Sequence, residues 1–249
     1  LKLLGVTEDD LKNYTVTTIT NADEHKYLDS YLSKSVIGTR ALSSVLVKGK
    51  TDGSGIKVTT YNITYCTTGM YQNALATAGI EDAEIVVAGP YNISGTAALV
   101  GAIKSYENMT GETVSQENVD TATNELVVTG KLAESVGDSD KAEQLVGAVK
   151  EQVVEGSDKG KKLTEEEIGN VVDQAAQEMD VQLSDEDRQE IVDLMDKIKG
   201  LDIDVDSLKE QAKDLYDKID DLGLKLDWNQ EKVQGFFSKI IEFFKNLFS

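Results

Sequence analysis

The C-terminal run GFFSKIIEFFKNLFS constrains the folding of this chain more than any other feature, because it holds all five phenylalanines of the 249 residues. Burying one phenylalanine side chain is worth roughly 1.5–3 kcal/mol, so this run has the strongest local apolar driving force. At 100° per residue its apolar side chains share one arc of about 160°, which predicts an amphipathic helix over residues 228–248. The phenylalanines on this arc are Phe236, Phe237, Phe243, Phe244 and Phe248.

Two interpretations of this predicted helix stay open. The helix is too short and too charged to span a bilayer, which needs about 20 mainly apolar residues, so it must lie on a surface. It can pack on the helices that precede it and complete their core. It can also contact a partner protein, a membrane surface or a second copy of the chain, because a phenylalanine-rich face with flanking lysines suits an interface.

Composition divides the chain into two unlike parts near residue 113. Residues 1–113 hold 12 acidic and 9 basic residues, a net charge of −3, and residues 114–249 hold the remaining 33 acidic and 16 basic residues, a net charge of −17. The first part also holds 16 threonines and eight of the nine tyrosines, which favours strands there and helices afterwards. We therefore predict an α+β domain over residues 1–113 and an acidic all-helical domain over residues 114–249.

The runs of the first part predict a β-α-β-β-α-β order. The second and third strands are expected to form a hairpin, because the turn between them contains glycines that can adopt positive φ. This order matches the split, ferredoxin-like arrangement, in which two helices cover one face of an antiparallel sheet. The predicted elements are a strand over 14–20, a helix over 22–34, strands over 41–48 and 56–65, a helix over 70–78 and a strand over 84–88.

The second part shows signals for helices alone from Gln116 onward. Thr164 forms a capping box with Glu167, and Ser184 caps a second, similar helix. A third helix is expected over residues 206–222. The glycine-containing segment 156–160 is the best candidate for a linker.

The net charge of −20 disfavours nucleic-acid binding, which depends on lysines and arginines that neutralise phosphates. The spacing of Asp202, Asp204 and Asp206 resembles the start of a calcium loop. Ser207 and Lys213, however, stand where an EF-hand needs glycine and glutamate. We therefore predict no metal site and no cofactor.

The two residues best suited to nucleophilic catalysis lack the context it needs. His25, in the polar run NADEHKY, has no neighbouring pattern that would orient it as a base, so we interpret it as a solvated side chain. Cys66, in the run ITYCTTG, is interpreted as a small buried residue rather than a nucleophile. We assign no catalytic residues.

The run GPYNISGT, residues 89–96, is predicted to form a proline-containing turn from a strand into a helix that extends to about Tyr106. Ser94 is the expected N-cap of that helix. Free backbone N–H groups at a helix N-terminus bind anions, so Ser94, Gly95 and Thr96 are candidate binding residues for an anion or a peptide. The run lacks the Gly-Lys-Ser/Thr of a P-loop.

Several longer runs resemble one known family. They are IGTRALSSV from residue 37, GSGIKV from residue 53, NITY from residue 62, VVAGPYNISGTAALVG from residue 86 and, more loosely, LTEEEIGNVV from residue 163. Together they resemble the YpuA-like secreted proteins of Gram-positive bacteria, a domain family of unknown function. The resemblance implies an extracellular or envelope-associated protein whose precursor has a signal peptide, so we interpret Leu1 as an internal position. It assigns no catalytic residues.

These observations predict a non-catalytic binding or envelope-associated module whose partner is a protein or another envelope component, with self-association through the C-terminal helix as a further option. Two alternatives stay open. A carboxylate-based hydrolase of cell-wall polymers would need two carboxylates about 5 to 9.5 Å apart in a cleft. A calcium-stabilised adhesion module would gain thermal stability from calcium.

Overall fold

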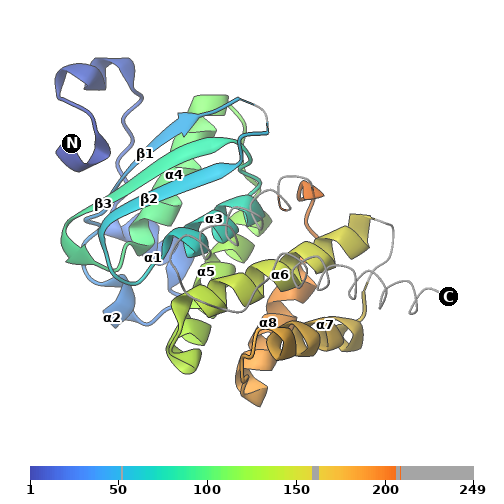
Figure 1. Ribbon diagram of the computed structural model, residues 1–249. Helices are drawn as coiled ribbons and strands as arrows, with labels where there is room; N and C mark the ends of the chain where they lie inside the picture. Colours follow the sequence, from blue (N-terminus) through green and yellow to red (C-terminus); the bar gives the residue numbers. More distant parts are fainter. Residues whose placement is uncertain (52, 159–162, 206–207, 209–249) are drawn as a thin grey trace. The chain divides into compact units, whose positions relative to one another are not determined.

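The computed structural model describes residues 1–51, 53–158, 163–205 and 208 of the chain. All of them belong to one compact unit, Leu1–Ala212. The described elements are a mixed three-stranded sheet and a larger set of helices (Figure 1). The predicted α+β fold class is therefore confirmed.

The sheet has the strand order β1-β3-β2, in which β1 is Ser44–Gly49, β2 is Ile56–Ile63 and β3 is Ala83–Ile93. The central strand β3 runs antiparallel to β1 and parallel to β2, with Val87 opposite Val45. Its run AEIVVA is nearly continuous in apolar residues, which is typical of a strand with neighbours on both edges and helices on its face.

The predicted hairpin between residues 41–48 and 56–65 is wrong, because β3 lies between the two arms. The loop that joins the arms is held by the carboxylate of Asp82. This carboxylate accepts hydrogen bonds from the backbone N–H groups of Gly53, Ser54 and Gly55 at 3.1, 2.6 and 2.8 Å. These bonds tie the loop to the residue before β3, so the loop does not close as the tight turn that would pair β1 with β2.

The ferredoxin-like arrangement is not confirmed. Residues 14–20, the predicted first strand, form no strand, and the sheet has three strands within the described part of the chain. Tyr14 and Thr20, at the two ends of this segment, do have extended backbone angles. Strand propensity alone therefore did not place the segment in the sheet, because a strand also needs a neighbour to pair with. Residues 1–13 form two short 3₁₀ helices, η1 (Lys2–Leu4) and η2 (Asp9–Asn13).

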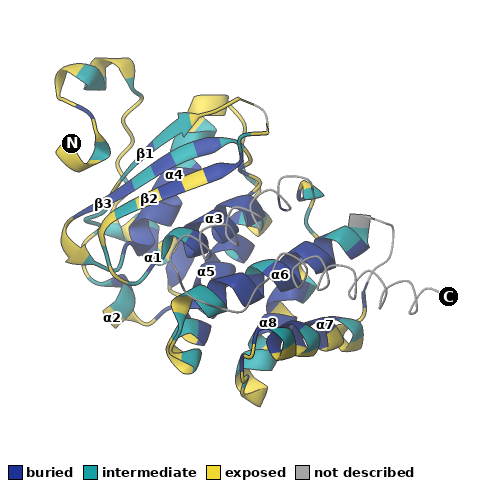
Figure 2. Cartoon of the chain, in the orientation of Figure 1, coloured by how far each residue is buried: buried dark blue, intermediate teal, exposed yellow. Residues whose placement is uncertain are grey.

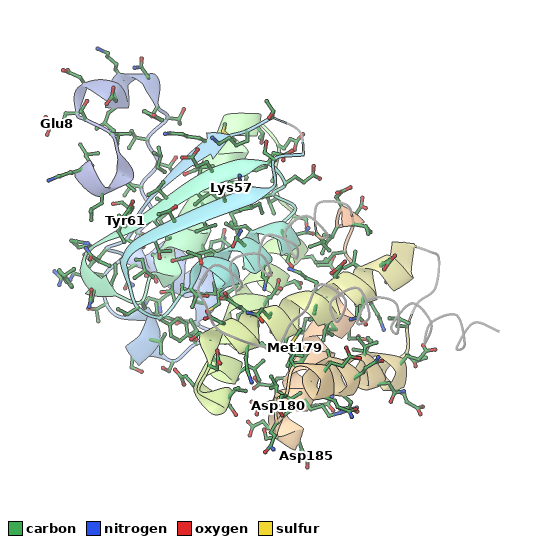
Figure 3. The ribbon with its side chains drawn as sticks, viewed as in Figure 1. Glu8, Lys57, Tyr61, Met179, Asp180 and Asp185 are labelled. Atoms are coloured by element: carbon green, nitrogen blue, oxygen red, sulfur yellow. The ribbon has the colours of Figure 1, made fainter. Side chains whose placement is uncertain are left out.

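Helices α3 (Thr68–Thr77) and α4 (Thr96–Thr110) cover one face of the sheet, α3 against β2 and α4 against β1 (Figure 1). Successive side chains of β2 point to opposite faces of the sheet, so its buried and exposed residues alternate at the start of the strand. Lys57 and Tyr61 are exposed on the strand (Figure 3), whereas Ile56 and Val58 are buried. The core of the first part therefore lies between the sheet and these two helices (Figure 2).

The predicted helix over residues 22–34 is divided into α1 (Asn21–Leu28) and α2 (Lys34–Ile37). A capping box of Thr20 and Asp23 begins α1. The division allows apolar side chains from both helices to pack on α5. In a single straight helix, residues nine positions apart would be separated by about 13 Å along the axis. The buried cluster consists of Leu28, Leu32, Ile37 and Val127.

Strand β3 extends to Ile93, so the predicted turn at Gly89 and Pro90 is wrong. The register between β2 and β3 shifts between Tyr61 and Ile63, and Asn62 has a φ of +57°. The side-chain nitrogen of Asn62 donates a hydrogen bond to the carbonyl of Gly89 at 3.0 Å. A strand tolerates proline at such an irregularity, because the ladder there does not need its missing N–H.

The regular elements of the second part are all helices within the described residues. Its helices are α5 (Gln116–Val136), α6 (Ser139–Asp158), α7 (Glu165–Glu178) and α8 (Asp185–Ile198). The capping box of Thr164 with Glu167 and the cap by Ser184 are confirmed, and Asp187 completes the second box. Figure 3 marks Asp180, between α7 and α8, where φ is +50°.

The helices on the two sides of residue 113 are in contact, since α3 packs against both α5 and α6. The division into domains at this residue stays a prediction. Residues 156–158 of the proposed linker belong to α6, and the other two lie outside the described residues. The predicted helix over 206–222, except Leu208, and the phenylalanine-rich helix also lie outside them.

Candidate functional site

The three binding residues predicted from the sequence, Ser94, Gly95 and Thr96, line a cavity of about 410 Å³. We call it the Glu24 cavity. It lies where the end of β3, the start of α4, the loop after α2 and the start of α1 meet. Residues distant in the sequence therefore meet in one place. Its polar lining includes Glu24, Ser35, Thr39, Arg40, Ser43, Thr64, Tyr65, Ser94 and Thr96.

Glu24 is the carboxylate of this cavity, and its side chain is buried. The hydroxyl of Thr96 donates a hydrogen bond to its Oε1 at 2.6 Å, and the side-chain nitrogen of Asn21 donates to its Oε2 at 3.2 Å. The backbone N–H of Ala97 also donates to the carboxylate. Burial nevertheless raises the pKa of Glu24, because its donors are neutral groups. The carboxylate of Glu24 thus lies at the N-terminus of α4, the positive end of the helix dipole, where an external anion would otherwise bind.

Gly95 holds the turn into α4 in a conformation that other residues rarely adopt. Its φ is +92°, and a Cβ atom there would lie 2.5 Å from the hydroxyl of Tyr71. The same hydroxyl donates a hydrogen bond to the carbonyl of Gly95 at 2.6 Å. The predicted N-cap role of Ser94 is wrong, because Gly95 holds the N-cap position and the hydroxyl of Ser94 lies 3.3 Å from that of Thr96. Glu24 supplies the acceptor that a capping serine would otherwise provide.

Three further polar groups of the cavity are available to a ligand. The hydroxyl oxygen of Ser43 is buried and has no hydrogen-bond partner within the described part of the chain. Arg40 is exposed, and its Nη2 reaches only a long contact of 3.5 Å with the hydroxyl of Tyr91. Burial raises the pKa of Tyr65 to about 12, so its hydroxyl stays neutral and can both donate and accept.

Among the described residues, the lining contains one carboxylate, one guanidinium and several hydroxyls, and neither histidine nor cysteine. Such a set can bind a polar ligand by hydrogen bonds and one charge contact. Among the described residues of the lining, Glu24 is the one carboxylate, so they do not supply the pair of carboxylates on which a glycosidase depends.

Comparison with known proteins shows the family of the chain but assigns no role to this cavity. Residues 1–215 match the family model described as "Protein of unknown function (DUF1002)". The chain belongs to the DUF1002 family. The uncharacterized protein YpuA of Bacillus subtilis (strain 168) is 39% identical over 199 residues, which cover 80% of this chain and 67% of that protein. The predicted resemblance to YpuA-like proteins is confirmed, and no solved structure matches the chain significantly.

Neither of the two residues considered for catalysis lines the cavity in this DUF1002 protein, although each directly follows a lining residue, Glu24 or Tyr65, in the sequence. Cys66 is buried, and burial raises the pKa of its thiol to about 12, so the thiol stays protonated and unreactive. The imidazole Nδ1 of His25 lies 2.5 Å from the carboxylate of Asp29, one turn along α1. Asp29 raises the pKa of His25 through this contact.

Among the described residues of this family member, no three acidic, histidine or cysteine side chains gather as a metal ion would require. Asp202 and Asp204 belong to the described residues, whereas Asp206 does not. The described helices include none that is long and apolar enough to cross a membrane. The five phenylalanines named above as candidate contacts lie outside the described residues, and their role stays a prediction.

Sequence reasoning missed Glu24 and Arg40. One signal for Glu24 was present, because it lies three and four residues before Tyr27 and Leu28 and so shares their face of α1. All three are buried. A carboxylate on the buried face of a helix needs partners from elsewhere, which marks it as a candidate site residue. Arg40 gave no such signal, since a loop arginine is expected to be solvated.

Proposed function

We propose that this protein is an exported, non-catalytic binding module that binds a small polar ligand in the Glu24 cavity. The resemblance to YpuA-like secreted proteins supports the proposal of export, to the outside of the cell or to its envelope. Binding without catalysis is supported by the lining, which has one carboxylate and neither histidine nor cysteine. Membership of a family of unknown function fits this reading.

The observation that carries the proposal is the convergence of sequence-distant polar groups on one cavity of ligand size. Pockets for small ligands typically measure about 300–1,000 Å³, and this cavity measures about 410 Å³. Arg40 and the unpartnered hydroxyl of Ser43 come from the loop before β1, whereas Ser94 and Thr96 come from the start of α4. The site is therefore built by the fold and not by one local motif.

The ligand class follows from the charges. Glu24 already binds the N-terminus of α4, so an anionic group of a ligand is expected at Arg40 and not at the helix end. A carboxylate or phosphate suits the planar guanidinium, which can donate two parallel hydrogen bonds. The hydroxyls of the lining then bind the polar remainder of the ligand.

The test uses the full chain labelled with ¹⁵N and two probes, the dipeptide Ala-Ala with a free carboxylate and the same dipeptide with an amidated C-terminus. We expect the free acid to shift the backbone amide signals of Ser43, Ser94 and Thr96, and the amide to shift them at least tenfold less at equal concentration. Arg40→Gln should remove the difference between the probes. Arg188→Gln is the matched control, because Arg188 lies on α8 and is paired with Asp173.

Three outcomes would count against the proposal. The first is that neither probe shifts these amide signals at tens of millimolar. The second is equal shifts with both probes, which would leave Arg40 without a role. The third is loss of the shifts in Arg188→Gln to the same extent as in Arg40→Gln.

The hydrolase alternative has no support in this cavity, because Glu24 is the single carboxylate among the described residues of its lining. Two carboxylates about 5 to 9.5 Å apart would be needed. We therefore do not propose hydrolysis, and we do not propose the calcium-stabilised alternative either.

A further inference from the structure

A second cavity, of about 780 Å³, runs beside the free edge of the sheet. We call it the β1 groove. One wall is β1, the opposite wall is the segment of residues 13–19, and the floor is α4 with the small residues Ala97, Ala98 and Gly101. Apolar side chains from the walls and the floor include Val16, Ile19, Val45, Val47 and Met109.

Within the described part of the chain, β1 is an edge strand of the sheet, and the opposite wall of the β1 groove forms no strand. Strand β1 pairs with β3 on its other edge, so one row of its backbone N–H and C=O groups is not used by the sheet. The segment YTVTTIT, residues 14–20, is β-branched at every residue after Tyr14. Among the described residues no backbone hydrogen bond joins this segment to β1.

The segment is held near α4 by one polar contact and leaves apolar surface exposed. The side-chain nitrogen of Asn108 donates a hydrogen bond to the hydroxyl of Thr17 at 2.8 Å. Val16 next to it is 70% exposed, and Met109 on α4 is 44% exposed. Exposed apolar side chains beside an open strand edge are typical of a surface that binds another chain.

The charge of the groove limits what can bind there. The chain holds 45 acidic residues, yet none of those that the structure describes lines the groove. Lys48 is the one charged side chain among the described residues of the lining. An uncharged extended segment, or one with a single acidic residue opposite Lys48, meets no repulsion in this groove. A basic segment would be repelled by Lys48 and would find no acidic side chain among the described residues of the groove.

We propose that the β1 groove binds an extended, β-branched peptide segment of a partner protein, which adds to the sheet as a fourth strand along β1. Main-chain hydrogen bonds to the free edge of β1 would provide affinity, and the apolar side chains of the groove would select alternate side chains of the peptide. The volume of the groove lies in the range typical of binding sites, about 300–1,000 Å³. This site is separate in its chemistry from the Glu24 cavity, although Leu42, Ser43 and Ala97 line both.

The test measures binding of a fluorescein-labelled peptide, acetyl-YTVTTIT-amide, to the full chain by fluorescence anisotropy. This probe copies the chain's own strand-forming segment, which has the required chemistry. We expect saturable binding below millimolar concentration and a loss of at least tenfold in affinity when the peptide is N-methylated at alternate residues on one edge. N-methylation on the other edge should have a smaller effect, because only the first edge faces β1.

Variants of exposed residues keep the fold intact and test the location. Val16→Lys and Met109→Lys place a charge in the groove and are expected to weaken peptide binding at least tenfold. Leu3→Lys is the matched control, because Leu3 is a 41% exposed apolar residue of the N-terminal region outside the groove lining. Arg40→Gln should leave peptide binding unchanged, which separates this proposal from that for the Glu24 cavity.

Four outcomes would overturn the proposal. The absence of saturable binding would remove the peptide as occupant, and equal binding of all N-methylated peptides would show that no strand forms. A concentration-dependent dimer of the free chain that Val16→Lys abolishes would identify a second copy as the occupant. Hydrogen exchange as slow at residues 15–19 as in β1 would show that the chain's own segment already pairs there.

Discussion

Glu24 and Glu125 are two buried carboxylates that this molecule stabilises in different ways. Their residues are 1% and 0% exposed. Glu24 receives hydrogen bonds from neutral donors and borders a cavity. Glu125 on α5 forms an ion pair with Lys150 on α6, in which the lysine Nζ lies 2.9 Å from Oε1.

The pair of Glu125 and Lys150 belongs to a closed network that joins three helices. The Nζ of Lys150 also donates to the backbone carbonyl of Asn73 at 2.8 Å and to the hydroxyl of Thr77 at 3.3 Å, both on α3. The hydroxyl of Thr77 in turn donates to Oε2 of Glu125. Burial lowers the pKa of Lys150, and the nearby carboxylate of Glu125 opposes this shift. Neither charged residue lines the Glu24 cavity or the β1 groove.

The difference between the two carboxylates shows why a buried charge is not by itself a sign of a binding site. In the network of Glu125 the opposite charge is supplied by the protein, and Glu125 lines neither the Glu24 cavity nor the β1 groove. At Glu24 the protein supplies neutral donors and leaves space beside the carboxylate. A buried carboxylate is therefore a candidate for ligand binding when a cavity reaches it and no internal cation neutralises it.

The largest expected effect would come from breaking the closed network. Lys150→Met should lower the free energy of unfolding by about 3–5 kcal/mol, because it leaves the charge of Glu125 buried without a partner. Chemical denaturation monitored by circular dichroism measures this change. The double variant Lys150→Met with Glu125→Leu should recover most of the loss, because it removes both charges together.

Lys131→Met is the matched control for this first prediction. Lys131 forms an ion pair with Glu190, but its side chain is 51% exposed, so the loss should stay within about 1 kcal/mol. Equal losses in Lys150→Met and Lys131→Met would contradict the assigned structural role of the buried pair. So would a double variant that is less stable than Lys150→Met alone.

A smaller effect is expected from removing one hydroxyl at each carboxylate. Thr77→Val and Thr96→Val each delete a hydroxyl that donates to a buried carboxylate and keep nearly the same shape. We expect a loss of about 2 kcal/mol for Thr77→Val, within the usual range of about 1–3 kcal/mol for a buried group left without its partner. Thr96→Val should cost about 1 kcal/mol, because a water molecule in the adjacent cavity can replace the hydroxyl. Denaturation measures both losses. A larger loss for Thr96→Val than for Thr77→Val would contradict the distinction between Glu24, which borders a cavity, and Glu125, which belongs to the closed network.

The helices of this fold could be predicted from the sequence because their signals are local. The capping boxes at Thr164 and Ser184 each need only residues three positions apart, and both formed as expected. The order of the strands could not be predicted in this way. That order depends on the position of β3 between β1 and β2. It also depends on the hydrogen bonds of Asp82 to the loop that joins β1 and β2, and these partners lie 27 to 29 residues from Asp82 in the sequence.

The candidate site likewise has residues that the sequence predicts and a residue that it does not. Ser94, Gly95 and Thr96 could be found because a strand leads into a helix at a glycine, which is a local signal. Their internal ligand, the carboxylate of Glu24, lies 72 residues from Thr96 in the sequence. The packing of α1 against α4 brings Glu24 to Thr96, and the local signals of a single sequence do not predict such a contact.

The smallest expected effect is a pH dependence that separates Glu24 from ordinary surface carboxylates. Burial raises the pKa of Glu24 in the folded state above the value of about 4.3 usual for an unfolded chain. The folded protein then keeps this proton to a higher pH than the unfolded chain. The stability of the wild type relative to Glu24→Gln should therefore be greatest below about pH 4 and fall as the pH rises through the raised pKa.

Glu84→Gln provides a control of opposite sign for this last prediction. The ion pair with Lys50 lowers the pKa of Glu84, so the contribution of this carboxylate is present above its unfolded value and is lost as the pH falls through the lowered pKa. Denaturation midpoints of the wild type and both variants between pH 3 and pH 8 give the two differences. If both differences change in the same direction with pH, Glu24 does not carry the raised pKa that its burial beside the cavity implies. A bound anion at Arg40 would lie in the same cavity as Glu24. Adding N-acetyl-Ala-Ala, which has a free carboxylate and no ammonium group, should therefore raise the pKa of Glu24 further and extend its pH dependence, whereas that of Glu84 should not change.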